Sequence, residues 1–381
     1  MTVLYLIDTL AVGGSERSLL EILRRFNHAQ PIICHIYPGE ALKPAYEAAG
    51  IPVISLNIPG KYSFLKAVNA VADLLKKHKP DLLCTTLFRA DVAGRIAGRL
   101  ARVPVMSSFV NEPYHPDRWE SLSASVWLKL KITQWLDRLT ARWSSHFIAV
   151  SESSKAANCK ALAIPPHKVS VIYRGRDPES IPVISPERLK QLRRDLSLSP
   201  ESPILLNIAR LLHRKGQEEL VKAHALVLQA FPSARLLIAG DGHDRPKLEW
   251  VIKEQNLTHA VHLLGTRQDI PELLNLAEVF VFPSHYEGHP GSLLEAMFAA
   301  RPIVASDIPV HRETITPRVS GLLAPCHHPA ELSQSILWML KNPNEAKRMG
   351  ERAREVAHER FQIDHIAALH EKLHERTIQQ L

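Results

Sequence analysis

The sequence predicts an α/β protein with two doubly wound parallel sheets, arranged as two Rossmann-like domains that face a cleft. Short runs rich in β-branched and other apolar residues alternate with longer helical runs, as expected for parallel sheets covered by helices on both faces. A length of 381 residues suits two domains, each large enough to bury its own core. Residues 174–186 are rich in proline and have the composition of a linker between the two domains.

The first domain is expected to span residues 1–178. Its predicted strands are residues 3–7, 31–36, 52–56, 82–86, 103–107, 147–150 and 169–173. Helices are predicted at residues 15–26, 41–49, 64–78 and 91–102, and another begins at Ser151. The first strand leads through Gly13 and Gly14 into a helix, which aims backbone N–H groups at a ligand. A tight turn alone would also need glycine at these positions.

The second domain is expected to span residues 186–362. Its predicted strands are residues 203–209, 235–239, 261–264, 279–282, 302–305 and 321–323, with helices between them. Turns follow the second and third of these strands, and they contain Gly240 and Arg267. We interpret both segments primarily as turns, and contact with a ligand is the secondary interpretation.

Composition restricts the class of protein. A hydrophobic content of 45% with 23% charged residues is that of a globular protein, and no apolar run approaches the length of a membrane span. The N-terminus has no basic leader with a cleavage site, so it is predicted to be a strand. The four cysteines lie far apart without a C-x-x-C pair, which predicts a reduced, cytoplasmic protein without a zinc ribbon.

The net charge of +8 is concentrated in one quarter of the chain. Residues 61–146 contain 14 Lys and Arg against 7 Asp and Glu, which is an excess of +7. A basic surface there would attract anionic lipid, a phosphorylated substrate or nucleic acid. No zinc-finger spacing or basic segment with heptads supports nucleic acid, and a solvated basic face is the simpler alternative.

Residues 284–297 contain the strongest candidates for chemistry. A loop rich in glycine and proline follows a predicted strand, and a helix starts near Ser292. Glu287 lies in this loop, and Glu295 follows eight residues later in the first helical turn. Unpaired backbone N–H groups at a helix start suit a phosphate, and here they belong to Gly291, Ser292, Leu293 and Leu294. Ser292 and Glu295 also match a capping box, in which the carboxylate only satisfies a backbone N–H group.

His285 and His289 are four residues apart in the same loop. A glycine- and proline-rich loop lacks the helical geometry of a metal-binding pair, so no metal site is predicted from them. We expect His289, with Tyr286, to line the ligand pocket.

Arg210 and Lys215 follow the first strand of the second domain. Both can face the crevice that contains Glu287, because ligands of doubly wound sheets bind beyond the carboxyl ends of the strands. A guanidinium and an ammonium group are natural partners of a diphosphate. Basic residues at a helix start oppose the helix dipole, so helix stability does not explain them.

The segment 283–307 closely resembles the E-x7-E region of the family-4 retaining glycosyltransferases of the GT-B fold. The similarity lies in its P-S-x-x-E-G, L-E-A-M and P-I-V-A-S-D words, and residues 210–215 match the R-x4-K pattern of the same family. The resemblance implies that the helix at 363–381 crosses back to the first domain. It also implies transfer of a sugar from a nucleoside diphosphate with retention, without a metal ion or a cofactor.

The resemblance implies roles for individual residues. Arg210 and Lys215 would clamp the donor diphosphate, and Glu287 would bind the donor sugar near the anomeric carbon. Glu295 would bind the ribose. The positions implied to border the nucleotide or the donor phosphate are Gly13, Gly14, Gly240 and Arg267.

The first domain departs from the family pattern at two positions. The family's histidine or polar position after residues 84–86 appears here as Phe88 and Arg89. Many relatives have a histidine in the loop after the strand that ends near Ser107. In this chain either Asn111 or His115 would take that place.

Four of the six tryptophans lie within residues 117–144, interleaved with lysine and arginine. Taken as a helix, the segment mixes apolar and cationic positions, as helices at membrane surfaces do. An ordinary long helix packed on the sheet would explain most of these aromatic residues. We hypothesise that the segment makes a peripheral membrane contact and receives a lipid-linked or otherwise anionic acceptor.

The predicted function is a hexosyltransferase that uses a UDP or GDP sugar. Its acceptor would be the hydroxyl of a glycan, a lipid-linked molecule or a small molecule in cell-envelope glycan or glycolipid biosynthesis. We expect it in the cytoplasm, at the inner face of the membrane. One alternative is a nucleotide-sugar epimerase or hydrolase of the same fold, which would need an added base at the anomeric carbon. The other is a non-catalytic scaffold that binds nucleotide sugars.

Overall fold

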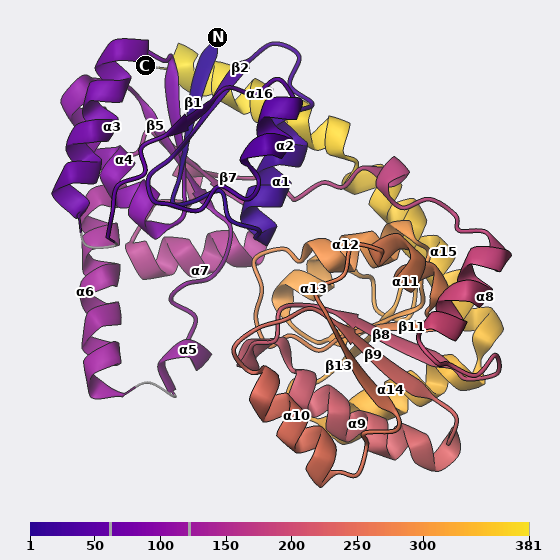
Figure 1. Cartoon of the computed structure of the whole chain (residues 1–381). Helices are drawn as coiled ribbons and strands as arrows, with labels where there is room; N and C mark the ends of the chain where they lie inside the picture. Colours follow the sequence, from indigo (N-terminus) through magenta and orange to yellow (C-terminus); the bar gives the residue numbers. More distant parts are fainter. Residues whose placement is uncertain (61–62, 121–122, 381) are drawn as a thin grey trace. The chain divides into compact units, whose positions relative to one another are not determined.

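The computed structural model describes residues 1–60, 63–120 and 123–380. The chain forms two compact α/β units, which are Met1–Gly175 with Ile363–Leu381, and Arg176–Gln362 (Figure 1). Residues 176–178, which the sequence analysis assigned to the first domain, therefore lie in the second unit. Each unit contains one parallel sheet with helices, so the predicted fold class is confirmed.

The sheet of the first unit has seven parallel strands in the order β3-β2-β1-β4-β5-β6-β7. Its strands are β1 (Thr2–Ile7), β2 (Gln30–His35), β3 (Val53–Ser55), β4 (Leu82–Thr86), β5 (Val105–Phe109), β6 (His146–Ala149) and β7 (Val169–Val171). Its helices are α1 (Gly14–Leu23), α2 (Lys43–Ala48), α3 (Phe64–His78), α4 (Phe88–Ala101), α5 (Asp117–Glu120), α6 (Ala124–Ala141), α7 (Glu152–Leu162) and α16 (Ile363–Gln379). The central strands are buried because helices cover both faces.

The sheet of the second unit has six parallel strands in the order β10-β9-β8-β11-β12-β13. Its strands are β8 (Ile204–Ile208), β9 (Arg235–Ala239), β10 (Val261–Gly265), β11 (Val279–Phe282), β12 (Ile303–Ser306) and β13 (Leu322–Ala324). Its helices are α8 (Pro186–Asp195), α9 (Gln217–Ala230), α10 (Arg245–Glu254), α11 (Ile270–Leu276), α12 (Gly291–Phe298), α13 (Pro309–Thr314), α14 (Pro329–Lys341) and α15 (Pro343–Arg360). A short 3-10 turn, His213–Lys215, precedes α9.

The strand order of the second unit reverses between β8 and β11, which are hydrogen-bonded neighbours. Successive strands extend the sheet in one direction up to β10 and in the other direction from β11 onward. The loops after β8 and β11 therefore leave the same edge of the sheet on opposite sides and open a crevice between them. This topology brings residues 209–216 close to residues 283–291.

The last helix, α16, belongs to the first unit, as the resemblance implied. It lies beside α1, and its apolar side chains join the core around β1 (Figure 1). The Glu371 carboxylate on this helix is buried and accepts hydrogen bonds from three consecutive backbone N–H groups. The donors are Asn27, His28 and Ala29, with N···O distances of 3.1, 2.7 and 2.7 Å. One side chain thus attaches the C-terminal helix to the turn before β2.

Among the described residues, none of the helices combines the length and the apolar character that crossing a bilayer requires.

Replacing Glu371 with alanine is expected to destabilise the first unit. The variant leaves three N–H groups without their carboxylate, and hydrogen bonds to charged groups contribute about 1.5–3 kcal/mol. Urea unfolding of Glu371→Ala should show a loss of at least this size in the free energy of unfolding. Glu375→Ala, which changes an exposed glutamate on the same helix, is the matched control. Equal stability of the two variants would contradict the attachment.

Candidate active site

Residues 210–215 and 283–291 meet at the carboxyl ends of β8 and β11. The Nζ atom of Lys215 donates a hydrogen bond to Oε1 of Glu287, and Nη1 of Arg214 lies 3.2 Å from Oε2 of the same carboxylate. Glu287 is 7% exposed and Lys215 is 9% exposed. The two motifs that the sequence placed in one crevice are therefore in direct contact, through a buried ionic group.

Burial raises the pKa of Glu287, but the positive charges of Lys215 and Arg214 outweigh it, so the pKa lies below its usual range. The carboxylate is therefore ionised at neutral pH. Burial lowers the pKa of Lys215, Glu287 opposes this shift, and Arg214 and Arg210 add to the lowering. A dense group of cations with one buried carboxylate has a net positive charge, which suits an anionic ligand.

Arg214 belongs to this group, although the sequence motif does not predict a role for it. Its Nη1 atom also donates to the backbone carbonyl oxygen of Tyr286 at 3.0 Å, and its guanidinium lies over the Tyr286 ring, 5.4 Å from the centroid. Arg214 therefore supports the loop that carries Glu287. The R-x4-K spacing predicts a role only for its first and last residues, although Arg214 belongs to the same basic run.

Arg210 is exposed at the end of β8. Its backbone carbonyl oxygen accepts a hydrogen bond from Nε2 of Gln217 at 3.1 Å, which anchors the backbone next to α9. Among the described residues the Arg210 side chain has no ion-pair partner, so its guanidinium is available to a ligand. Its positive charge contributes to the lowered pKa of Lys215.

Glu295 does not serve as a helix cap. Helix α12 has Pro290 as its N-cap residue, without a capping side chain, so the capping-box alternative is wrong. Oε1 of Glu295 accepts a hydrogen bond from Nε of Arg176 at 2.8 Å. A Cβ atom on Gly291 would lie 1.6 Å from Nη2 of Arg176, so a larger residue here would displace the guanidinium from its present position. Arg176 lies in a segment with the composition of a linker, and only the structure connects it to the site.

Helix α12 begins at Gly291, so the backbone N–H groups of Gly291, Ser292 and Leu293 lie in its first turn. The side chains of Leu293 and Leu294 are buried, so at these positions a ligand could contact only the backbone. The Leu294 N–H group donates to the carbonyl oxygen of Pro290 at 3.4 Å, so the expectation that it is unpaired is wrong. Ser292 is half-buried. The first N–H groups of a helix lack intrahelical acceptors and favour an anion.

The remaining candidate residues of the second unit are His289, Arg267 and Gly240. His289 is buried, and its ring centroid lies 5.2 Å from that of Phe361. Arg267 forms an ion pair with Asp269 at 2.5 Å, directly after β10. Gly240 has a φ of +137°, and a Cβ atom there would lie 2.0 Å from the carbonyl oxygen of Ala209, so the turn itself requires glycine.

The candidates of the first unit lie in loops at the ends of its strands. Helix α1 begins at Gly14, with Gly13 as its N-cap. A Cβ atom on Gly13 would lie 2.2 Å from the Glu16 carboxylate. Asn111 is exposed, and its backbone carbonyl oxygen accepts a hydrogen bond from Nδ2 of Asn158 at 3.1 Å. His115 lies 3.5 Å from Asp117, so the loop presents Asn111 and holds His115 next to acidic side chains.

Comparison with known proteins gives the family of this fold and site. The sequence model of the family described as Glycosyl transferases group 1 matches residues 190–356, and that of Glycosyltransferase Family 4 matches residues 12–180. The chain is 31% identical over 271 residues to an Escherichia coli enzyme named UDP-Gal:alpha-D-GlcNAc-diphosphoundecaprenol alpha-1,3-galactosyltransferase. This match covers 70% of the chain and 68% of the relative.

The chain belongs to glycosyltransferase family 4.

Two further proteins are similar to this glycosyltransferase over most of its length. N,N'-diacetylbacillosaminyl-diphospho-undecaprenol alpha-1,3-N-acetylgalactosaminyltransferase of Campylobacter jejuni is 28% identical and covers 82% of each chain. The crystal structure of HepE from Anabaena in complex with UDP and glucose superposes with a TM-score of 0.86 at 25% identity. That match covers 98% of the glycosyltransferase and 99% of HepE. The predicted GT-B architecture and hexosyltransferase activity are thereby confirmed.

Replacing Lys215 with methionine should reduce sugar transfer strongly and also destabilise the second unit. The change leaves Glu287 buried with one cation instead of two, and breaking a buried pair costs about 3–5 kcal/mol. The double variant Lys215→Met with Glu287→Gln should regain part of this stability without regaining activity. Thermal unfolding and initial transfer rates measure the two effects.

Lys222→Met is the control, because Lys222 is an exposed lysine on α9 that pairs with Glu218 on the surface. It should leave both readouts unchanged. Wild-type transfer rates in Lys215→Met would exclude Lys215 from the catalytic group.

Proposed function

We propose that this glycosyltransferase moves a hexose from a UDP sugar to a hydroxyl of a saccharide linked to a polyprenyl diphosphate. Transfer would proceed with retention of anomeric configuration and without a metal ion at the diphosphate. The assignment of the nucleotide-sugar donor rests on the group of cations around Glu287, at the point where the strand order of the second sheet reverses. The similarity to HepE, a protein crystallised with UDP and glucose, supports the same assignment.

The reaction breaks the bond between the anomeric carbon and an oxygen of the diphosphate, while a bond to the acceptor oxygen forms and the acceptor proton passes to the departing diphosphate. Negative charge grows on the terminal phosphate of the leaving group. Arg210, Lys215 and the N–H groups at the start of α12 would stabilise that charge, as preorganised cations and dipoles do. The ionised Glu287 would bind sugar hydroxyls beside the cationic anomeric centre.

Glu295 would bind the ribose of the donor. Arg176 fixes Oε1 of its carboxylate at 2.8 Å, which orients the second oxygen. A carboxylate accepts hydrogen bonds from vicinal hydroxyls, and an arginine that holds one oxygen reduces the entropy lost when those hydroxyls bind. We therefore assign Arg176 as the residue that positions Glu295.

The acceptor assignment rests on the relatives and on one surface of the first unit. The two relatives described above carry names that specify diphospho-undecaprenol-linked sugars. Helix α6 exposes large apolar side chains, among them Trp127, Ile132 and Trp135, the last of which is 60% exposed. The Lys131 ammonium group lies 4.6 Å from the centroid of the Trp119 ring. A long helix fully packed on the sheet would not expose these residues, so the membrane-surface interpretation of 117–144 gains support.

We accordingly propose that the enzyme acts in the cytoplasm at the inner face of the membrane, where exposed aromatic and cationic side chains of α6 meet anionic headgroups. Tryptophan suits this interface because its ring is apolar and its N–H group is polar.

Donor binding can be tested by thermal shift with UDP, GDP and ADP, followed by transfer assays with the corresponding sugars. UDP should raise the melting temperature, and a UDP sugar should be consumed only when a polyprenyl-diphosphate saccharide is present. Consumption of the donor without an acceptor would support a hydrolase. Failure of every nucleotide to shift the melting temperature would support a scaffold instead.

Membrane contact can be tested by co-sedimentation with vesicles containing anionic lipid. Ile132→Gln with Trp135→Gln should reduce the bound fraction at low salt, because both side chains are exposed on α6. Trp250→Gln, on α10 in the second unit, changes a tryptophan of similar exposure and serves as the control. Absence of wild-type binding to anionic vesicles would refute the contact.

A further inference from the structure

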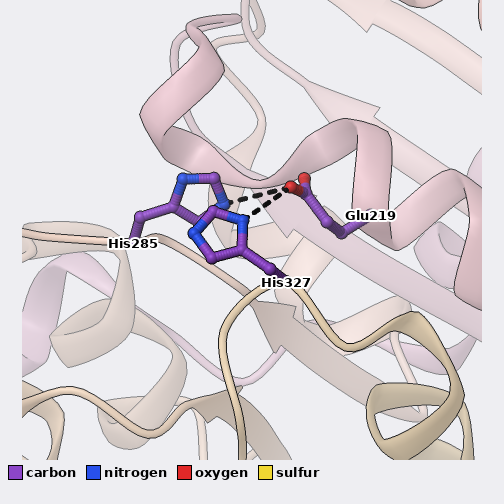
Figure 2. A group of neighbouring side chains, drawn as sticks. All are labelled: Glu219, His285 and His327. Carbon is purple, nitrogen blue, oxygen red and sulfur yellow. Dashed lines mark hydrogen bonds and ion pairs between the residues drawn. The ribbon is translucent and has the colours of Figure 1, made fainter. Parts of the chain in front are cut away.

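A second group of polar side chains lies apart from Lys215 and Glu287. It consists of Glu219, His285 and His327 (Figure 2). Glu219 is in the first turn of α9, His285 is in the loop after β11, and His327 is in the loop between β13 and α14. Three segments that are distant in sequence thus aim their side chains at one point.

The donor atoms of this group are close together. Nε2 of His285 and Nδ1 of His327 each lie 3.3 Å from Oε1 of Glu219, and the three ligand atoms lie within 4.8 Å of one another. The two imidazole rings are 4.0 Å apart between centroids. Figure 2 shows both rings directed at the same carboxylate oxygen.

These separations suit a tetrahedral metal ion. Zn²⁺ binds histidine nitrogen and carboxylate oxygen at about 2.0–2.2 Å, and tetrahedral angles then separate neighbouring ligand atoms by about 3.3–3.5 Å. Two of the separations, at 3.3 Å each, already have this length. The third separation, between the two histidine nitrogens, is within 4.8 Å, and His327 can shorten it because it lies in a loop and is largely exposed.

Burial indicates that hydrogen bonds alone do not satisfy the group. The His285 side chain is 4% exposed, and within the described residues the 3.3 Å contact of its Nε2 atom with Glu219 does not have hydrogen-bond geometry. Within the same described part of the chain, the buried Oε2 atom of Glu219 also lacks a hydrogen-bond partner. Buried polar atoms without partners are costly, and a bound cation would satisfy both.

We propose that Glu219, His285 and His327 form a binding site for Zn²⁺, with the fourth position open to water. Two imidazoles and one carboxylate select zinc over Mg²⁺ or Ca²⁺, which prefer oxygen ligands alone. The site is separate from the proposed diphosphate contacts and does not take part in the transfer step.

The expected role of the ion is to hold the loop that carries Glu287. His285 precedes Glu287 by two residues, and its backbone N–H group donates to the carbonyl oxygen of Arg214 at 2.8 Å. A metal bound to His285 would link this loop to α9 and to the loop before α14. The site would therefore stabilise the second unit against unfolding, because the unfolded chain lacks the assembled ligands.

The test is a titration of the untagged, metal-stripped full chain with Zn²⁺, followed by calorimetry and by thermal unfolding. The wild type should bind one ion and melt at a higher temperature with it. His327→Ala should weaken this binding at least about tenfold, because changes even beyond the direct ligands cost 10–100-fold in metal affinity. Glu219→Gln should weaken it as well, because an amide is a poor zinc ligand.

His328→Ala is the matched control, since it removes the adjacent exposed histidine, which lies near Glu331 and not in the group. It should bind Zn²⁺ as the wild type does. His327 is largely exposed, so its removal is compatible with folding, and circular dichroism without metal checks this. Unchanged affinity in His327→Ala, or absence of one-to-one binding in the wild type, would overturn the proposal. None of these measurements depends on the donor, the acceptor or the transfer activity.

Discussion

The buried contact of Glu287 with Lys215 and Arg214 is the interaction on which the active site depends. A carboxylate in the interior is tolerated only when cations and hydrogen bonds compensate its charge. The compensation exists because β8 and β11 are neighbours, although about 70 residues of chain separate them. Their loops leave the sheet on opposite sides of the reversal point, so an acidic loop and a basic turn share one crevice. Arg210 follows β8 at this crevice and is exposed.

The loop after β11 is held from several directions. Its Glu287 side chain faces the cations, its His285 side chain faces Glu219 and His327, and the carbonyl oxygen of Ser284 accepts from the Ser306 hydroxyl. A loop of glycine and proline has little stability of its own, so these contacts decide its conformation. Precise positions of catalytic groups require such support, because small displacements weaken transition-state contacts strongly. The inferred zinc site would add a further link to the same loop.

Most of the architecture was predictable from the sequence, because strands that are buried on both faces of a sheet appear in the sequence as short apolar runs. Strands β4, β9 and β11 have the predicted bounds, and the other strands differ by one or two residues at their ends. The pairing of Lys215 with Glu287 was also predictable, since both follow strands of one parallel sheet. Arg176 was not, because it lies outside the motifs in a segment with linker composition, and it reaches Glu295 only through folding.

By itself, then, the sequence determined the two parallel sheets, the family, and the polar residues that follow particular strands. Periodicity and strand-end motifs are local properties, and local properties can be read along the chain. Tertiary structure alone decided that Arg176 occupies the space left by Gly291, that Arg214 supports the acidic loop, and that His285 meets His327 rather than forming a pair with His289. Each of these contacts joins side chains from separate segments, and their distances depend on how helices and loops pack around the sheet.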